Sequence, residues 1–285
     1  MLRVRVEATS ANVCVGFDVL GIALGLYNEF TFEKKKSFSF KGFADEFSNI
    51  NNNLVYDSYM AVFKKLNYNP IPVEIGFKGD IPVSRGLGSS SSLIVAGVFA
   101  ANHMLNNPLT KDECFNICCE IEGHPDNVAP AIYGNLVASY KKDGKYIPVS
   151  YSINKDLKFI TIIPPYKIST HEARGVLPKE LPYSDIVNNT SRIINLPKAL
   201  YDGNVDMLID LFEDKMHEPY RSKLIKEYDE IKSICNKNNA AFAISGSGST
   251  MLAIAKNIDF ISELNKFNFD IKCLKIGEGI KIWEE

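Results

Sequence analysis

PVSRGLGSSSS, residues 82–92, is the stretch of this sequence that says most about the fold, because it leads into an apolar run of helical length, LIVAGVFAANHML (93–105). Gly86 and Gly88 permit positive φ and let a ligand approach the backbone closely. The serines stand where a helix begins, with unpaired N–H groups and the positive end of its dipole. Such a terminus attracts phosphate. The sequence therefore predicts a phosphate-binding loop made of Pro82, Val83, Ser84, Arg85, Gly86, Leu87, Gly88, Ser89, Ser90, Ser91 and Ser92.

This loop has no lysine, whereas the common phosphate loop ends in Gly-Lys-Ser/Thr. The charge of a phosphate would have to be met by backbone N–H groups, by a metal held on serine hydroxyls, and by Arg85. The alternative interpretation is a flexible Gly/Ser loop. A dinucleotide fingerprint is excluded, because Ser91 stands where its third glycine would be, and the chain has no GxSxG.

Composition indicates an ordinary globular protein. The 285 residues are 46% hydrophobic and 23% charged, enough for one large or two medium domains. A formal net charge of -2 offers no overall basic field for nucleic acid or an anionic membrane. The six cysteines form no CxxC pair, and the N-terminal sequence MLRVRVEATSAN lacks the apolar core of a signal peptide. The longest apolar run is too short to span a bilayer. We expect a cytoplasmic protein that keeps its cysteines reduced.

Hydrophobic periodicity predicts a mixed α+β chain. Expected strands cover 3–9, 22–34, 73–77, 135–140, 146–151, 159–164, 241–244, 251–255 and 271–276. Expected helices cover 53–66, 93–105, 111–121, 184–200, 205–216, 224–237 and 256–267. Thr110 and Glu113 form a capping-box pattern, and Gly123 predicts the end of that helix. We place a domain boundary near residue 152, which gives domains of 1–152 and 153–285.

Four other segments gather polar residues in predicted loops: 8–18, 120–127, 169–174 and 217–221. Each has an ordinary structural explanation when taken alone. Asn12 and Asp18 could be turn residues, and His124 a capped loop histidine. Arg174 and Arg221 could be surface charges.

Together, these segments resemble the motifs of the GHMP kinases, the superfamily of galactokinase, homoserine kinase, mevalonate kinase and phosphomevalonate kinase. The similarity is greatest to the homoserine kinases. It is carried, in order along almost the whole chain, by ATSANVCVGFDVLGIAL (8–24), PVSRGLGSSSS (82–92), EGHPDNVAPAIYG (122–134), STHEARGVLP (169–178), HEPYR (217–221) and ISGSGST (244–250). The resemblance implies an N-terminal domain like ribosomal protein S5 domain 2 and a ferredoxin-like C-terminal domain. ATP would lie in the cleft between them, and a homodimer is suggested.

The resemblance also implies a magnesium site. Ser90 matches the family's magnesium-binding serine and Glu120 its magnesium carboxylate, an oxygen donor set that suits Mg²⁺. Glu122 is the competing choice, although two residues along a helix turn it to a different face. Asn53 resembles the adenine-side segment of the family.

For the substrate, the resemblance implies a pocket that fits a zwitterion with a terminal hydroxyl. Arginine forks bind carboxylates bidentately, and Arg174 and Arg221 match the family's pair. Asp18 would meet the ammonium, and Asn127 would hold the reacting hydroxyl. The remaining matches are Asn12 and His124 beside Asp18, Thr170 and Gly248 at pocket positions, and Asp126 either in the pocket or bracing its loop.

The reaction implied is ATP-dependent phosphorylation of the L-homoserine hydroxyl to O-phospho-L-homoserine, a step of threonine biosynthesis. Other members of the superfamily use an aspartate base near the position of Asn127, so we expect direct attack on the γ-phosphate without a dedicated base. Three alternatives stay open from the sequence. They are another GHMP small-molecule kinase of the mevalonate type, a non-catalytic nucleotide-binding regulator, and an RNA-binding protein, although no basic stripe supports the last.

Overall fold

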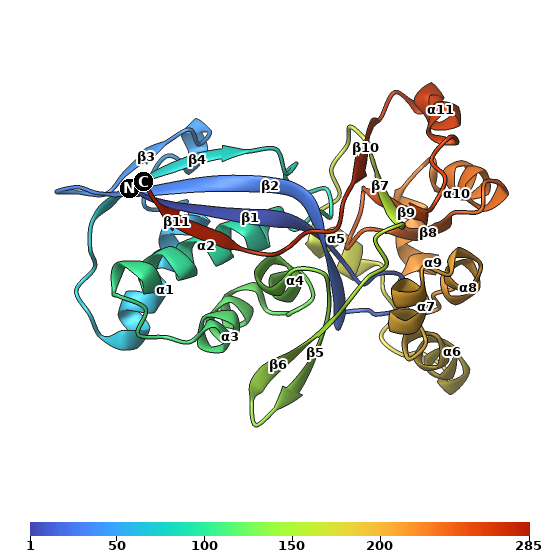
Figure 1. The fold of residues 1–285 in the computed structure, drawn as a ribbon, viewed down its shortest axis with the longest axis horizontal. Helices are drawn as coiled ribbons and strands as arrows, with labels where there is room; N and C mark the ends of the chain where they lie inside the picture. Colours follow the sequence, from blue (N-terminus) through green and yellow to red (C-terminus); the bar gives the residue numbers. More distant parts are fainter.

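The computed structural model describes residues 1–285 and divides them into two lobes, each built on its own sheet (Figure 1). The first sheet has the order β11-β1-β2-β4-β3, with β5 on β2 and β6 on β5. Its strands are β1 (Leu2–Ala11), β2 (Leu20–Lys34), β3 (Ser39–Lys41), β4 (Val73–Gly79), β5 (Leu136–Lys142), β6 (Lys145–Tyr151) and β11 (Lys281–Glu284). All pairs are antiparallel except β3 with β4.

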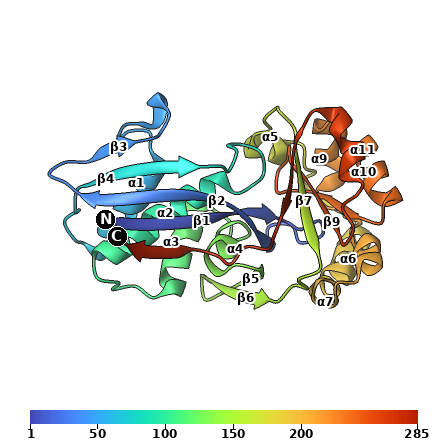
Figure 2. The same ribbon diagram turned by 45° about the horizontal axis from the view of Figure 1, so that its top comes forward.

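Helices cover one face of this first sheet (Figures 1 and 2). They are α1 (Leu54–Leu66), α2 (Ser89–Met104), α3 (Lys111–Glu122) and α4 (Val128–Tyr133), preceded by the 3-10 turn η1 (Asp45–Phe47). Leu2, Val4 and Val6 of β1 are buried, while the alternating Arg3 and Arg5 are half-exposed, so one face of the strand builds the core. The result is a core of 28 buried residues between sheet and helices.

The second sheet has the order β10-β7-β9-β8, all antiparallel. Its strands are β7 (Lys158–Ile163), β8 (Ala241–Ile244), β9 (Met251–Ala255) and β10 (Asp270–Leu274). Numbered along the chain, this order is 4-1-3-2, the split arrangement of a ferredoxin-like sheet. The helices of this lobe are α5 (Thr170–Gly175), α6 (Tyr183–Ile193), α7 (Leu196–Asp202), α8 (Val205–Leu211), α9 (Glu218–Arg221), α10 (Tyr228–Lys237) and α11 (Ile261–Leu264), with 3-10 turns η2 (Ser222–Leu224) and η3 (Asn265–Phe267).

The two lobes are joined more closely than a single boundary near residue 152 implies. Strand β11, at the end of the chain, returns to pair with β1, so residues 281–284 belong to the first sheet rather than to a domain of 153–285. The Met1 ammonium donates to the Glu285 carbonyl at 2.6 Å, and both termini lie side by side in Figures 1 and 2. A second core of 25 residues includes Ile22 of β2 together with Ile254 of β9 and therefore spans both lobes.

The α+β class and most expected elements are confirmed. Thr110 and Glu113 form the predicted capping box of α3, and Gly123 ends that helix in the left-handed conformation. The hairpin β5–β6 turns at Asp143-Gly144 as predicted. The helix expected over 184–200 is wrong, because Pro197 at the start of α7 cannot continue α6.

Other boundaries also differ from the prediction. The helix expected over 205–216 ends at Leu211, the one over 224–237 begins at Tyr228, and the one over 256–267 is reduced to α11 and η3. The short elements β3, α4, α5, α9 and β11 were not predicted, since three to six residues carry too little periodicity. No helix is long and apolar enough to cross a membrane.

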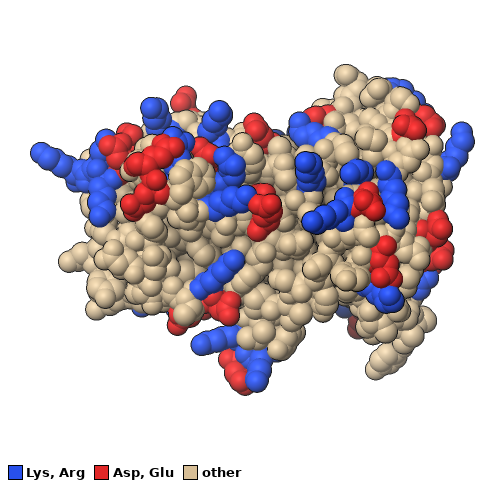
Figure 3. Space-filling model, in the orientation of Figure 1, with Lys and Arg blue, Asp and Glu red and all other residues tan.

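Acidic and basic side chains are interspersed on the face shown in Figure 3. This mixture agrees with the near-neutral net charge of the chain.

Close packing of α2 on α1 generates a stability prediction. A Cβ on Gly97 would lie 2.4 Å from the Val55 carbonyl oxygen, an overlap the two helices cannot absorb without moving. Gly97→Ala should therefore lower the free energy of unfolding by about 1–3 kcal/mol, although alanine is intrinsically favoured in a helix. Urea unfolding measures this change. Gly175→Ala in α5 is the matched control, because its Cβ meets nothing within 4 Å; a stability equal to wild type in Gly97→Ala would contradict the packing argument.

Candidate active site

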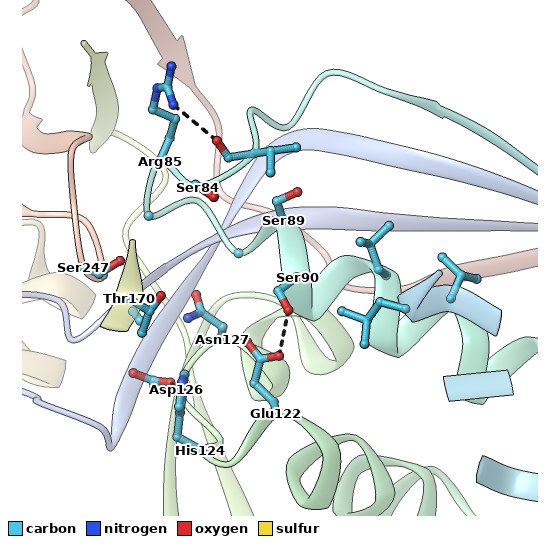
Figure 4. A pocket seen from close by; sticks show the side chains of 18 of the residues that line it. Ser84, Arg85, Ser89, Ser90, Glu122, His124, Asp126, Asn127, Thr170 and Ser247 are labelled. Atoms are coloured by element: carbon cyan, nitrogen blue, oxygen red, sulfur yellow. Dashed lines mark hydrogen bonds and ion pairs between the residues drawn. The ribbon is translucent and has the colours of Figure 1, made fainter. Parts of the chain in front are cut away.

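A cavity of about 430 Å³ opens between the two lobes and collects most of the residues singled out in the sequence. Its wall comes from segments far apart in the chain, namely 11–18, 43–55, 77–93, 122–127, 170–174, 221 and 246–247, and Figure 4 shows part of it. The predicted site residues that line it are Asn12, Asp18, Asn53, Val83, Ser84, Arg85, Gly86, Gly88, Ser89, Ser90, His124, Asp126, Asn127, Thr170, Arg174 and Arg221. Those that do not are Pro82, Leu87, Ser91, Ser92, Glu120 and Gly248.

Hydrogen bonds join the end of strand β1, the loop of residues 82–92 and the β8–β9 turn beside this cavity. The Ser245 hydroxyl donates to the Gly86 carbonyl at 2.6 Å and lies 2.9 Å from the Ser10 hydroxyl. The Gly246 amide donates to the Ala11 carbonyl at 3.2 Å. Gly86 has φ +74, and a Cβ there would stand 2.1 Å from the Ser245 carbonyl oxygen. Glycine at this position is therefore required for the loops to meet.

The N-terminus of α2 faces the cavity without a side-chain cap. Gly88, with φ 70, is its N-cap residue, and no acidic residue lies in the first turn. Ser89 and Ser90 of that turn line the cavity. This 16-residue helix therefore presents free N–H groups and the positive end of its dipole to the cavity. Phosphate binding at this helix end stays a prediction.

Arg85 does not serve this end of the cavity in the way the sequence suggested. Its guanidinium donates to the carbonyls of Pro164 and Pro165, at 3.1 and 2.6 Å. Its third hydrogen bond goes to the Val83 carbonyl of the same loop, at 3.3 Å (Figure 4). Arg85 therefore connects the loop to the end of β7. The expectation that Arg85 contributes to phosphate binding is not supported by this geometry.

Glu122, and not Glu120, is the carboxylate beside Ser90. The Ser90 and Ser91 hydroxyls donate to the two Glu122 carboxylate oxygens at 3.1 and 2.8 Å (Figure 4). The Glu120 side chain is 64% exposed and forms an ion pair with Lys65 at 2.9 Å. Two residues along a helix correspond to about 200° of rotation, so only one of these glutamates can face the loop. The placement of Glu120 beside Ser90 is wrong, and Glu122 takes its place as the candidate metal ligand.

Oppositely charged side chains line the other end of the cavity. Arg174 donates to both Asp18 oxygens, at 2.8 and 3.0 Å, which joins α5 to the loop after β1. Nearby, His124 is hydrogen-bonded to the buried Asp126. Burial lowers the pKa of His124, but the hydrogen bond and charge of Asp126 outweigh it and leave that pKa raised. Asp18, His124 and Asp126 present polar atoms within 4.8 Å of one another.

Arg221 is buried near the Arg174–Asp18 pair. Its Nε donates to the Ala173 carbonyl at 3.1 Å and its Nη1 to the Gly246 carbonyl at 3.0 Å. Burial, followed by the charge of Arg174, lowers its pKa to about 10, which still leaves it charged at neutral pH.

The Asn12 side chain connects two backbone segments at this end of the cavity. Its amide donates to the Gly246 carbonyl at 2.9 Å, and its oxygen accepts the Asp18 N–H at 3.1 Å. Asn12, Val13 and Cys14 all have left-handed φ, of 69, 41 and 64°. Strained backbone of this kind persists where surrounding contacts fix it, and it clusters at functional sites.

Asn127 lies between the two ends of the cavity (Figure 4). Its side-chain oxygen accepts a hydrogen bond from the Thr9 hydroxyl at 2.7 Å, which leaves the amide N–H groups as its free donors. Thr170 also lines the cavity as the first residue of α5. Gly248 was expected in the wall, but its neighbours Gly246 and Ser247 are there instead.

An apolar recess forms part of the cavity wall. Phe43, Phe47, Phe77 and Leu93 line it, and the sequence did not single these residues out. They are separated along the chain and share no motif, so only folding brings them together. Asn53 lines the same recess, with its side chain engaged by the Tyr56 amide at 3.0 Å and the Phe47 carbonyl at 2.7 Å.

Comparisons with known proteins agree with this geometry. Residues 53–135 match the GHMP kinases N terminal domain and residues 196–266 the GHMP kinases C terminal domain. The fold is also similar to a crystal structure of mevalonate kinase, with a TM-score of 0.72 at 18% identity, covering 98% of this chain and all of that one. The two-domain architecture is thus that of a GHMP kinase, an ATP-dependent small-molecule kinase.

More similar relatives identify the branch. The chain is 38% identical to a homoserine kinase of Clostridium botulinum, covering 98% of this chain and 97% of that one. It is 42% identical to the homoserine kinase of Clostridium beijerinckii, covering 94% and 91%. A crystal structure of homoserine kinase from Cytophaga hutchinsonii superposes with a TM-score of 0.86 at 27% identity, covering 99% and 97%. The chain belongs to the homoserine kinase family.

The two glutamates of α3 provide a matched pair of variants. Glu122→Gln should lower kcat or apparent Mg²⁺ affinity by about 10- to 100-fold, the range found when a metal site loses a supporting oxygen. Glu120→Gln should leave both unchanged, because Glu120 contacts only Lys65 on the surface. Steady-state assays over a range of Mg²⁺ concentrations measure both, with circular dichroism to check folding. A larger loss in Glu120→Gln would restore the original assignment.

Proposed function

We propose that this enzyme transfers the γ-phosphoryl group of ATP to the side-chain hydroxyl of L-homoserine, giving O-phospho-L-homoserine for threonine biosynthesis. The observation that carries the proposal is the difference between the two ends of the cavity. One end presents the uncapped N-terminus of α2, and the other presents Asp18 with Arg174 and Arg221. Between them lies Asn127. From the family resemblance we also propose that the enzyme is cytoplasmic and forms a homodimer. Light scattering measures the molar mass in solution and so tests the homodimer.

The residues at the α2 end fit ATP with Mg²⁺. Ser90 and Glu122 supply adjacent oxygen donors, the ligand type that Mg²⁺ prefers. The first-turn N–H groups would bind the phosphates, and the apolar recess with Phe43 and Phe47 would take the base. When bound, Mg²⁺ would neutralise part of the phosphate charge.

The opposite end fits a zwitterion. In the structure Asp18 and Arg174 satisfy each other, so neither charge lacks a partner before substrate arrives. A bound homoserine would offer an ammonium to Asp18 and a carboxylate to Arg174 and Arg221, replacing one pair of opposite charges by two. Arg174 is only partly buried and can adjust, whereas Arg221 is fixed by two carbonyls.

Phosphoryl transfer depends on positioning and charge stabilisation more than on covalent chemistry of the protein. The homoserine oxygen would bond to the γ-phosphorus as the bond to the β–γ bridging oxygen breaks, and ADP would leave. Asn127 can orient the hydroxyl by donating an N–H but cannot take its proton. Asp126 is already engaged by His124. The proton would therefore leave late, to a γ-phosphoryl oxygen.

Substrate choice tests the proposal directly. In an ATP-consumption assay over L-homoserine, L-serine, L-threonine, mevalonate and galactose, L-homoserine should give the highest kcat/KM. Mevalonate should stay near background, because it has no ammonium to pair with Asp18. Faster turnover of mevalonate would overturn the homoserine assignment and leave the kinase assignment intact.

The absence of a base is tested by replacing Asn127 and Asp126 separately. Asn127→Ala should reduce kcat by roughly one to three orders of magnitude through lost orientation. Asp126→Asn should raise the homoserine KM but leave the shape of the kcat–pH profile unchanged, since a general base produces its own acidic limb. Loss of an acidic limb in Asp126→Asn, with kcat down by several orders and homoserine affinity intact, would identify Asp126 as a base.

A further inference from the structure

Phe17 brings the two arginines of the site onto one aromatic ring, although it does not itself line the cavity. The Arg221 guanidinium carbon lies 5.2 Å from the Phe17 ring centroid, and that of Arg174 lies 5.7 Å from it. Both distances are within the range in which a cation is attracted by the electrons of an aromatic face. These two arginines come from α5 and α9, so this ring is their common contact.

His217 holds the Phe17 ring in place. The two rings stack with centroids 5.4 Å apart and an interplanar angle of 29°. His217 is fully buried, and its Nε2 is 2.7 Å from the Cys14 carbonyl oxygen, in the same loop as Phe17. At its backbone, Asp214 accepts the N–H groups of residues 216, 217 and 218 at 3.1, 2.7 and 2.7 Å. The histidine therefore connects the loop after β1 to α9.

The Phe17 and His217 rings lie beside two guanidinium groups of like charge. Two guanidinium groups that face one ligand repel each other, and Arg174 contributes to the lowered pKa of Arg221. Burial lowers the pKa of His217, so its ring stays neutral and adds no third positive charge beside Arg221, whose Nη1 is 3.5 Å from Nδ1. The aromatic face attracts both cations without neutralising either, so the ring does not compete with an anionic ligand for their charge. Arg174 keeps Asp18 as its partner until such a ligand arrives.

We propose that Phe17, held by His217, is a positioning residue that keeps the guanidinium groups of Arg174 and Arg221 where both can bind the substrate carboxylate. Phe17 thereby favours substrates that carry a carboxylate. The proposal rests on the homoserine function, in which these arginines bind that carboxylate. Phe17 acts through the arginines and does not touch the reacting atoms.

Steady-state kinetics of Phe17→Leu and Phe17→Tyr test the role with substrate. Phe17→Leu keeps an apolar side chain but loses the aromatic face, so the homoserine KM should rise roughly 5- to 30-fold, the combined effect of two cation–π contacts. The KM for ATP should not change, and Phe17→Tyr should stay within about twofold of wild type because its ring face is retained. With 3-amino-1-propanol, which is homoserine without its carboxylate, kcat/KM should be equally low in wild type and Phe17→Leu.

Phe38→Leu is the matched control, since Phe38 packs on Tyr56 away from the cavity. It should leave the homoserine KM unchanged. An unchanged homoserine KM in Phe17→Leu, or an equal rise in the KM values of homoserine and ATP, would overturn the proposal.

A measurement without substrate separates this proposal from the proposed function. In protein labelled with ¹⁵N-arginine, the Nε–H signals of Arg174 and Arg221 should be shifted upfield by the Phe17 ring and lose that shift in Phe17→Leu. Arg192 is paired with Glu213 and forms no cation–π contact with Phe17, so its signal should not move. If wild type fails to phosphorylate homoserine, the proposed function is wrong, and this signal alone then decides whether Phe17 organises the arginines. Unchanged Nε–H signals of Arg174 and Arg221 in Phe17→Leu would refute the positioning role of Phe17, whatever the substrate of the enzyme is.

Discussion

The hydrogen-bonded junction of Ser10, Gly86 and Ser245 is the contact on which the rest of the site depends. It joins three segments that are up to 235 residues apart in the chain: the end of strand β1, the loop of residues 82–92 and the β8–β9 turn. Its geometry is possible only without a side chain at Gly86. Because the junction unites both lobes, the N-terminus of α2 is presented to the same cavity as the arginines of α5 and α9.

The cavity separates its charges along its length. Ser90 and Glu122 provide oxygen atoms near a positive helix end, a combination suited to a metal and phosphates together. At the other end, Arg174 and Asp18 form a pair that is only partly buried and therefore exchangeable, whereas Arg221 is fixed in the interior by backbone carbonyls. A neutral amide between these ends suits a reaction in which the attacking group needs orientation rather than a base.

Uncharged rings contact the two arginines at this end of the cavity. Phe17 and His217 form an uncharged layer behind the arginines, and Asp214 fixes that layer through backbone N–H groups. Placing two guanidinium groups near each other, with Arg221 buried, is costly unless each has polar or aromatic partners. Phe17 is their shared aromatic partner. The polar partners are backbone carbonyls for Arg221 and the Asp18 carboxylate for Arg174.

What the sequence by itself determined was local. The capping box of Thr110, the helix end at Gly123 and the phosphate loop before α2 each depend on residues within a few positions of one another, so their patterns are visible without a fold. The motifs also predicted which segments would meet. Only the tertiary structure decided that Glu122 rather than Glu120 faces Ser90, that Arg85 binds proline carbonyls 79 and 80 residues away, and that β11 returns to the first sheet. It also decided that Phe17 lies against two arginines. Such contacts join residues distant in the chain, and local periodicity contains no information about where a side chain finds its partner across the fold.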